Sequence, residues 1–146
     1  MTPEKIVDEL GYGDAVRRQI EHEDVLIVNR LSWLIASQSF LFTAYAIILN
    51  GPVLTRNEHF AAHGELLVKI IPLLAISACV LIYLGICGGV RLMADLRREL
   101  GRHHTAMGGL RPPIQGTRLT LFLGQCAPLG LPPIFAAAWT ILFFTQ

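Results

Sequence analysis

The sequence predicts an all-α integral membrane protein, a bundle of three transmembrane helices with helical extensions into the cytoplasm. Of its 146 residues, 53% are hydrophobic and 16% are charged, whereas a soluble domain averages about 25% charged residues. All Asp, Glu, Lys and Arg residues lie outside three stretches, 31–50, 70–90 and 119–144. A helix needs roughly 20 apolar residues to cross a bilayer core about 30 Å thick. Each stretch is therefore long enough to be a span.

These stretches divide the chain into short segments. Chains below about 40 residues rarely fold alone, so the flanks leave no room for a separate soluble enzyme domain. The net charge of +1 also excludes the basic footprint of a nucleic-acid binder. We expect a cytoplasmic N-terminal helical segment at 1–30, spans at 31–50 and 70–90, an outer loop at 51–69, a cytoplasmic helix and linker at 91–118, and a proline-broken third span at 119–146.

The N-terminal segment predicts two helices in succession. Thr2, Pro3 and Glu4 form a start signal for a short helix that ends at residue 10, and the glycines at 11 and 13 predict a break. A second helix then runs from 15 to 50. Its cytoplasmic half carries an apolar stripe, which predicts packing on the extension of the second span, on a neighbouring subunit or on lipid headgroups. The stripe consists of Val16, Ile20, Ile27 and Leu31.

The distribution of basic residues predicts the orientation of the spans, because cytoplasmic loops carry an excess of Lys and Arg. The N-terminal flank and the second loop together hold ten of the twelve Lys and Arg residues, and the first loop holds two. The flank and second loop lie on the same side when the chain has three spans. We therefore expect a multi-pass protein of the bacterial inner (plasma) membrane, with a cytoplasmic N-terminus and an outside C-terminus.

Small and polar residues recur every three or four positions along the first span. Small residues let helices approach closely in lipid, and hydroxyl groups can bond across the contact. The second span has a similar pair of glycines four positions apart. The pattern predicts helix packing, with a polar pore face as the alternative. The residues are Ser32, Ala36, Ser39, Thr43, Ala46 and Asn50 in the first span, and Gly85 and Gly89 in the second.

Polar side chains inside the spans predict contacts between helices. Gln38 and Tyr45 share a face of the first span, and Gln125 in the third span is the expected partner of Gln38. Arg30 lies at the boundary of the first span. It is expected either to extend its charge toward the membrane surface or to pair with Asp95 on the adjacent helix.

The third span contains Pro128, Pro132 and Pro133. Proline removes a backbone donor and kinks or breaks a helix. A kinked span is one interpretation, because membrane helices tolerate proline. A re-entrant or broken helix, buried in protein or lining a cavity, is the other.

The sequence offers little for catalysis. His59 and His63 are four positions apart and are weak candidates for a metal site, but the Glu that a metalloprotease helix needs next to its first His is missing. No Ser-His-Asp set, P-loop or dinucleotide fingerprint is present. We therefore expect no catalytic residues, no resident metal and no cofactor.

One segment resembles a known group of proteins. Residues 21–49 contain Glu21-His22-Glu23-Asp24, Leu26-Ile27, Arg30, Trp33, Gln38 and Phe40-Leu41-Phe42, a pattern that resembles the opening of small, uncharacterised bacterial membrane proteins. The resemblance implies a bacterial inner-membrane protein and implies nothing about catalysis.

The expected function is non-enzymatic, through helix–helix association. The partners are the lipid bilayer and either a second copy of the chain, as a homo-oligomer, or another membrane protein that the chain serves as a small subunit. The alternatives are an oligomeric channel for ions or small solutes, including a membrane-disrupting pore, and, less favoured, a membrane enzyme or a metal- or haem-binding subunit.

Overall fold

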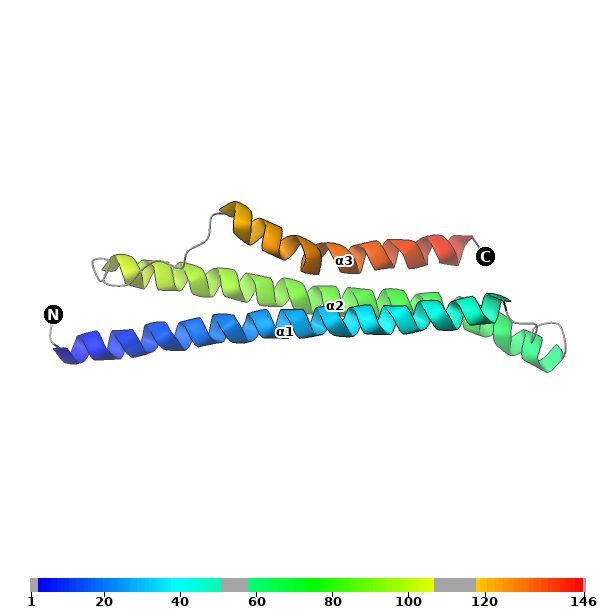
Figure 1. The fold of residues 1–146 in the computed structure, drawn as a ribbon, viewed down its shortest axis with the longest axis horizontal. Helices are drawn as coiled ribbons and strands as arrows, with labels where there is room; N and C mark the ends of the chain where they lie inside the picture. Colours follow the sequence, from blue (N-terminus) through cyan, green and yellow to red (C-terminus); the bar gives the residue numbers. More distant parts are fainter. Residues whose placement is uncertain (1–2, 51–57, 107–117, 146) are drawn as a thin grey trace.

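The structure, a computed structural model, describes residues 3–50, 58–106 and 118–145, with side chains described at 11–50, 63–102 and 124–145. It contains three helices, α1 (Pro3–Asn50), α2 (Glu58–Ala106) and α3 (Arg118–Phe144). The predicted all-α class is confirmed. The three helices form an elongated bundle, and the two ends of the chain lie toward opposite ends of it (Figure 1).

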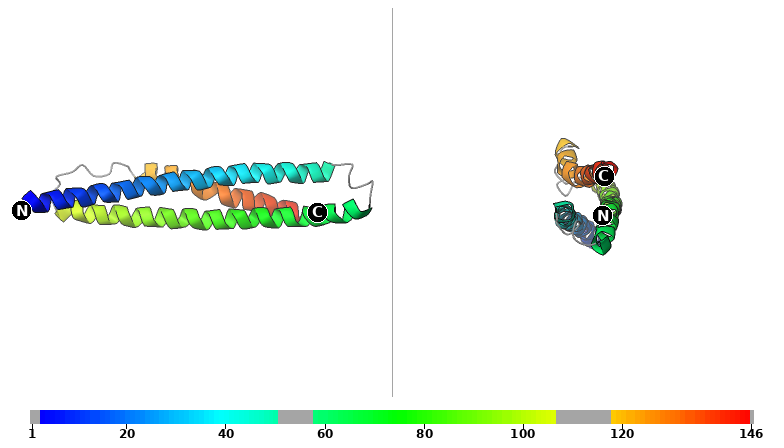
Figure 2. Two further views of the ribbon diagram at one scale, coloured as in Figure 1. Left: turned by 90° about the horizontal axis from the view of Figure 1, so that it is seen from below. Right: turned by 90° about the vertical axis from the view of Figure 1, so that its right-hand side faces the viewer.

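Helix α2 is the central element of the bundle. It runs antiparallel to α1 over most of its length and also packs along α3 (Figures 1 and 2). Helices α1 and α3 contact each other over a smaller region, which includes Phe42 on α1 and both Phe135 and Trp139 on α3. Over the described residues, neither α2 nor α3 covers the side of α1 that faces away from α2.

All three helices are long and apolar enough to cross a membrane. Helices α1 and α2 have 48 and 49 residues, which is roughly 70 Å each at about 1.5 Å per residue. A bilayer core is about 30 Å thick. The chain is therefore a multi-pass membrane protein, and α1 and α2 are each about twice as long as a bilayer core is thick. We call residues 3–30 and 91–106, which flank the uncharged stretches of these two helices, the stalk.

The contact between α1 and α2 is a continuous seam. Buried residues on each helix recur at intervals of three and four, as in an antiparallel coiled coil. Two clusters fill it. The stalk cluster contains Val16, Ile20, Ile27 and Met93 of the stalk together with Ile86 at the adjoining end of the second span. The span cluster contains Tyr45 of α1, Ile71 and Ala75 of α2, and Trp139, which α3 adds from outside the seam.

Helix α1 does not break at Gly11-Tyr12-Gly13, contrary to the expectation from the sequence. It is continuous from Pro3 to Asn50. Glycine inside a helix costs about 1 kcal/mol relative to alanine. Gly13 is buried and lies on the same side of the helix as Val16, so the packing of the seam outweighs this cost.

Helix α2 begins earlier than predicted, at Glu58, inside the expected outer loop. It continues to Ala106, within the segment expected to hold a cytoplasmic helix and linker. An acidic residue at the start of a helix interacts favourably with the positive end of the helix dipole, and α2 starts with Glu58. Lys69 donates a hydrogen bond to the carboxylate of Glu65, one turn earlier in the helix, at 2.8 Å. The expected Gly- and Pro-containing linker lies outside the described residues.

Helix α3 is continuous through its three prolines, so the structure has one bent helix in place of a broken one. The segment before the prolines turns away from α2, and the segment after them packs along it (Figure 1). Pro132 is buried. The neighbouring helices supply contacts that hold the chain helical where backbone hydrogen bonds are missing.

Candidate functional site

The polar side chains of the described residues gather in three places, and the first is the outward row. This is the row of small and polar residues in the first span (Ser32, Ala36, Ser39, Thr43, Ala46 and Asn50). The sequence predicted that the row packs on another helix. Every member is exposed in the structure, so neither α2 nor α3 covers it.

The hydrogen bonds of the outward row stay within α1. Ser39 donates to the carbonyl oxygen of Ile35 at 2.8 Å, and Thr43 donates to that of Ser39 at 2.8 Å. Ser32 and Asn50 make the same bond to the carbonyl four residues earlier. Each of these four side chains therefore has a hydrogen-bond acceptor within its own helix and needs no water, so the row can lie inside a membrane.

The second place is a polar layer in the seam at the boundary between stalk and spans. Arg30 donates from Nη1 to the carbonyl oxygen of Gly85 at 2.9 Å. It does not pair with Asp95, which faces Arg98 on its own helix. The guanidinium fits here because Gly85 and Gly89 have no side chains. A Cβ on Gly85 would lie 3.7 Å from the Arg30 side chain, and one on Gly89 would lie 3.4 Å from it.

Glu23 completes this polar layer. Only 9% of its surface is exposed. Gln19 donates to its Oε1 at 3.5 Å. Its Oε2 and the Arg30 Nη1 both lie 3.4 Å from the point where a Gly89 Cβ would be. The carboxylate and the guanidinium are therefore neighbours across Gly89, so the buried negative charge of Glu23 lies near the half-buried positive charge of Arg30.

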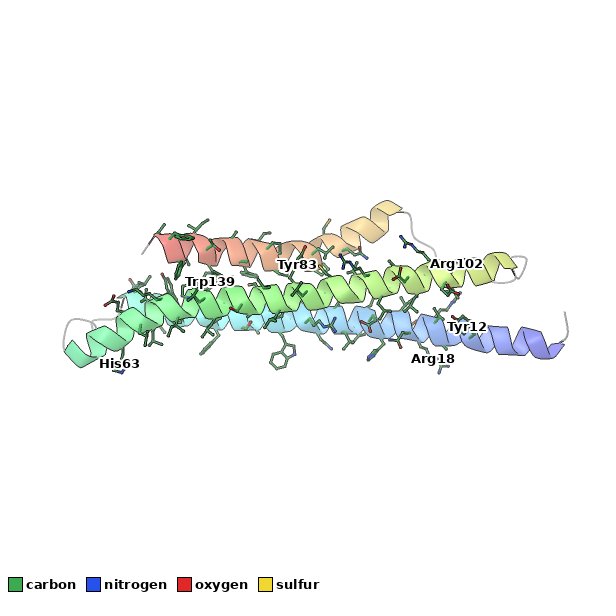
Figure 3. All side chains as sticks on the ribbon, turned by 180° about the vertical axis from the view of Figure 1, so that it is seen from behind. Tyr12, Arg18, His63, Tyr83, Arg102 and Trp139 are labelled. Carbon is green, nitrogen blue, oxygen red and sulfur yellow. The ribbon has the colours of Figure 1, made fainter. Side chains whose placement is uncertain are left out.

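The third place is Gln38, which is wholly buried in the first span. Its Oε1 accepts a hydrogen bond from the indole Nε1 of Trp139 at 2.6 Å. Its Nε2 donates to the carbonyl oxygen of Ala75 at 3.4 Å. One amide thus joins all three helices. Trp139 takes the place expected for Gln125, because it faces α1 and α2 at this level of α3 (Figure 3).

Aromatic contacts surround this amide. Trp139 stacks on Phe42 with ring centroids 4.2 Å apart, and the ring of Tyr45 meets it edge-on at 5.5 Å. Aromatic pairs in these geometries contribute about 0.5–1.5 kcal/mol beyond area burial. The arrangement holds the C-terminal half of α3 against α1.

Sequence reasoning missed Glu23 and Trp139. The signal for Glu23 was available, because Val16, Glu23 and Arg30 are spaced by seven and fall on the apolar stripe. Tracing the stripe through its charged members would have placed both charges in the seam. Trp139 gave a weaker signal, because tryptophan near the end of a span is typical of an interfacial anchor.

The described residues contain no group of three His, Cys, Asp or Glu that would hold a metal ion. His63 is exposed near the start of α2 (Figure 3), and the side chain of His59 lies outside the described residues. The three cysteines are free.

Comparison with known proteins gives no further assignment. The chain matches no family model, no curated protein and no solved structure.

Proposed function

We propose that the chain is a non-enzymatic protein of the bacterial inner membrane that acts through helix–helix association, as a homo-oligomer or as a small subunit of a membrane complex. The observation that carries the proposal is the exposed outward row. A row of small and hydroxyl-bearing residues is typical of the contact between membrane helices, and the described parts of α2 and α3 leave it uncovered.

The polar groups between the helices support the same proposal. Arg30 and Gln38 make their hydrogen bonds to backbone and side chains of neighbouring helices. Ionisable residues placed for ion pathways or proton relays usually lie inside spans, but 31–50, 70–90 and 119–144 contain no Asp, Glu, Lys, Arg or His. The chemistry of the spans therefore favours assembly over catalysis or coupled transport.

The test is the size of the complex in native membranes. Chemical cross-linking in intact membranes, followed by native mass spectrometry in mild detergent, should give a species larger than one chain. Monomer alone, in membranes and at every concentration in mild detergent, would contradict the proposal.

The proposed orientation places the N-terminus and the stalk in the cytoplasm and the C-terminus outside. Its support is the excess of basic residues on the stalk side. Alkaline phosphatase is active only outside the cytoplasm. Fused after Gln146 it should be active, and fused after Ala106 it should be inactive. The reverse pattern would overturn the orientation.

A channel is the second candidate, and the hydroxyl groups of the outward row favour it. Several copies arranged in a ring would turn Ser32, Ser39 and Thr43 toward a central axis. Reconstitution into liposomes distinguishes the two candidates. Ion or dye flux that Ser39→Leu abolishes would support a pore, and absence of flux from correctly inserted protein would exclude it.

A further inference from the structure

We propose that the exposed side of α2 binds an anionic phospholipid, with Arg91 holding the phosphate of the headgroup. This site goes beyond the proposed function, because it does not depend on association with another chain. Its apolar part, which we call the outer line, lies on the side of α2 that faces away from α1. The outer line consists of Leu73, Ser77, Val80, Leu84 and Gly88.

The outer line and Arg91 share one side of the helix. They recur at intervals of three and four residues, from Leu73 to Arg91, and all of them are exposed. Leu84 and Arg91 each precede a buried residue of the seam, Ile86 and Met93, by two positions, which is about 200° around the helix. The site therefore faces the surroundings of the bundle and not the seam.

The outer line presents an apolar surface over the depth of one leaflet. Val80 is 47% exposed and Leu84 is 61% exposed. Ser77 donates its hydroxyl to the carbonyl oxygen of Leu73 at 2.7 Å, so it turns no unpaired donor toward lipid. Val80 lies about 17 Å from Arg91 along the helix, close to half of a bilayer core about 30 Å thick. A lipid with its headgroup at Arg91 therefore lays its acyl chains along Leu84 and Val80.

Arg91 differs from the other basic residues that border the uncharged stretches and whose side chains are described. Arg30 donates to a backbone carbonyl of α2 at 2.9 Å, and Lys69 donates to Glu65 at 2.8 Å. Arg91 forms no hydrogen bond or ion pair with any residue that the structure describes. Its guanidinium therefore keeps its donors for a group outside this part of the chain.

The charges around Arg91 favour an anion. Residues 91–98 hold three arginines and one aspartate, a net charge of +2. That aspartate, Asp95, pairs with Arg98 at 3.6 Å. The carboxylate of Glu23 meets α2 at Gly89, which lies about 200° around the helix from Arg91. Anionic headgroups gather at basic residues next to a span, and a guanidinium binds phosphate through charge-assisted hydrogen bonds.

Gly88 leaves room for the headgroup between the outer line and the arginine. It precedes Arg91 by three positions on the same side of α2, and a Cβ there would meet nothing within 4 Å. A Cβ on Gly85 or Gly89, in contrast, would contact Arg30. The exposed backbone at Gly88 therefore allows the polar part of a lipid to approach the helix closely.

A phospholipid matches both parts of this surface. Its acyl chains match the outer line, and its phosphate matches the arginine at the end of that line. A free phosphate ion matches only Arg91 and leaves the apolar residues without a role. The combination of the two parts on one side of the helix therefore favours a lipid as the occupant.

Native mass spectrometry of the full chain in mild detergent tests the proposal. Phosphatidylglycerol and phosphatidylcholine with identical acyl chains are added in turn, and the fraction of chains that carries a lipid is measured. Arg91→Gln is compared with the matched control Arg102→Gln. Arg102 is also exposed (Figure 3), but it pairs with Glu99 at 2.9 Å and lies about 16 Å further from the span. Circular dichroism checks that each variant folds.

The native chain should retain phosphatidylglycerol about fivefold more than phosphatidylcholine, and Arg91→Gln should remove most of this preference, as expected for one arginine close to an anionic lipid. Arg102→Gln should keep it, because Arg102 lies further from the headgroup than the about 8 Å over which salt screens a charge. Equal retention of both lipids by the native chain would overturn the proposal. Equal losses in the two variants would show attraction to the whole basic segment and would overturn a site at Arg91.

Inorganic phosphate in excess should leave the phosphatidylglycerol bound, because it lacks the acyl chains that contact the outer line. Displacement by phosphate would overturn the lipid as occupant. The measurement counts lipids per chain, so its outcome does not depend on whether the chain forms an oligomer.

Thermal unfolding in vesicles gives an independent readout. Vesicles of phosphatidylcholine are compared with vesicles that also contain phosphatidylglycerol, and unfolding is followed by circular dichroism. Phosphatidylglycerol should raise the unfolding temperature of the native chain and of Arg102→Gln more than that of Arg91→Gln, because a ligand stabilises the folded state that binds it. The same rise in all three proteins would contradict binding at Arg91.

Discussion

The two clusters of the α1–α2 seam follow the same spacing but are built from different residues. The stalk cluster consists of aliphatic side chains and a methionine. The span cluster includes Tyr45 and Trp139 and lies beside the buried amide of Gln38. The stalk carries the charged residues of both helices, and where it lies in water the burial of apolar surface drives its packing. Lipid supplies no such drive, and the spans are held by close packing and hydrogen bonds between helices.

The largest effect is expected in the stalk cluster. Met93→Ala should lower the free energy of unfolding by about 2–5 kcal/mol, because it leaves a cavity at a side chain that is only 2% exposed. Leu92→Ala is the matched control, since Leu92 is 43% exposed, and surface changes usually stay within about 0.5 kcal/mol.

The measurement is an unfolding titration in detergent followed by circular dichroism. Equal losses in the two variants would show that apolar burial does not hold the stalk. The proposed difference between the two clusters, apolar burial in one and hydrogen bonds with close packing in the other, would then be wrong.

The next effect is expected at the polar layer. Gly89→Leu should destabilise the fold by about 1–3 kcal/mol, as overpacked sites do, because its side chain would enter the space of Arg30 and Glu23. Gly89→Ala should cost less, because its Cβ would lie at an ordinary contact distance of 3.4 Å.

Gly88→Leu provides the control for this position. A Cβ on Gly88 meets nothing within 4 Å, so the substitution should leave stability unchanged or raise it through helix propensity. The same unfolding titration ranks the three variants. If Gly88→Leu is as damaging as Gly89→Leu, the loss comes from glycine flexibility and not from the space that Arg30 occupies.

Features that depend on the local pattern of residues can be predicted from the sequence, whereas features that depend on how whole helices pack cannot. The spans follow from the distribution of charge alone. The stripe of Val16, Ile20 and Ile27 predicts that this part of α1 packs on a partner, but it does not decide between the extension of α2, a neighbouring subunit and lipid headgroups. The partner of Gln38 does not follow, because it depends on how far α3 is displaced along α1. That displacement decides whether Gln125 or Trp139 reaches the amide, and it results from packing of whole helices.

A smaller effect is expected for the hydrogen bond in the span cluster. In a double-mutant cycle, Gln38→Leu and Trp139→Phe should couple by about 0.6–1.7 kcal/mol, the range found for hydrogen bonds between membrane helices. The phenylalanine keeps an aromatic ring against Phe42 and removes the N–H that donates to Gln38.

Trp33→Phe is the control for this cycle, because Trp33 is 75% exposed and should show no coupling to Gln38. Unfolding in detergent gives the free energies of the four proteins. Zero coupling between Gln38 and Trp139 would mean that packing alone holds α3, and the span cluster would then resemble the stalk cluster.

The smallest effect is expected on the outward row. Ser39→Ala combined with Thr43→Ala should change the unfolding free energy of the monomer by no more than about 0.5 kcal/mol. Both hydroxyl groups donate only to carbonyl groups of α1, so their removal leaves no buried donor unpaired, and alanine is the better helix former. The measurement is the unfolding titration in detergent, at a protein concentration low enough to keep the chain monomeric. A loss of unfolding free energy as large as the coupling in the Gln38 cycle would mean that the row stabilises the fold of a single chain. An unchanged unfolding free energy would mean that the row does not stabilise the monomer, as expected if it serves contacts between chains.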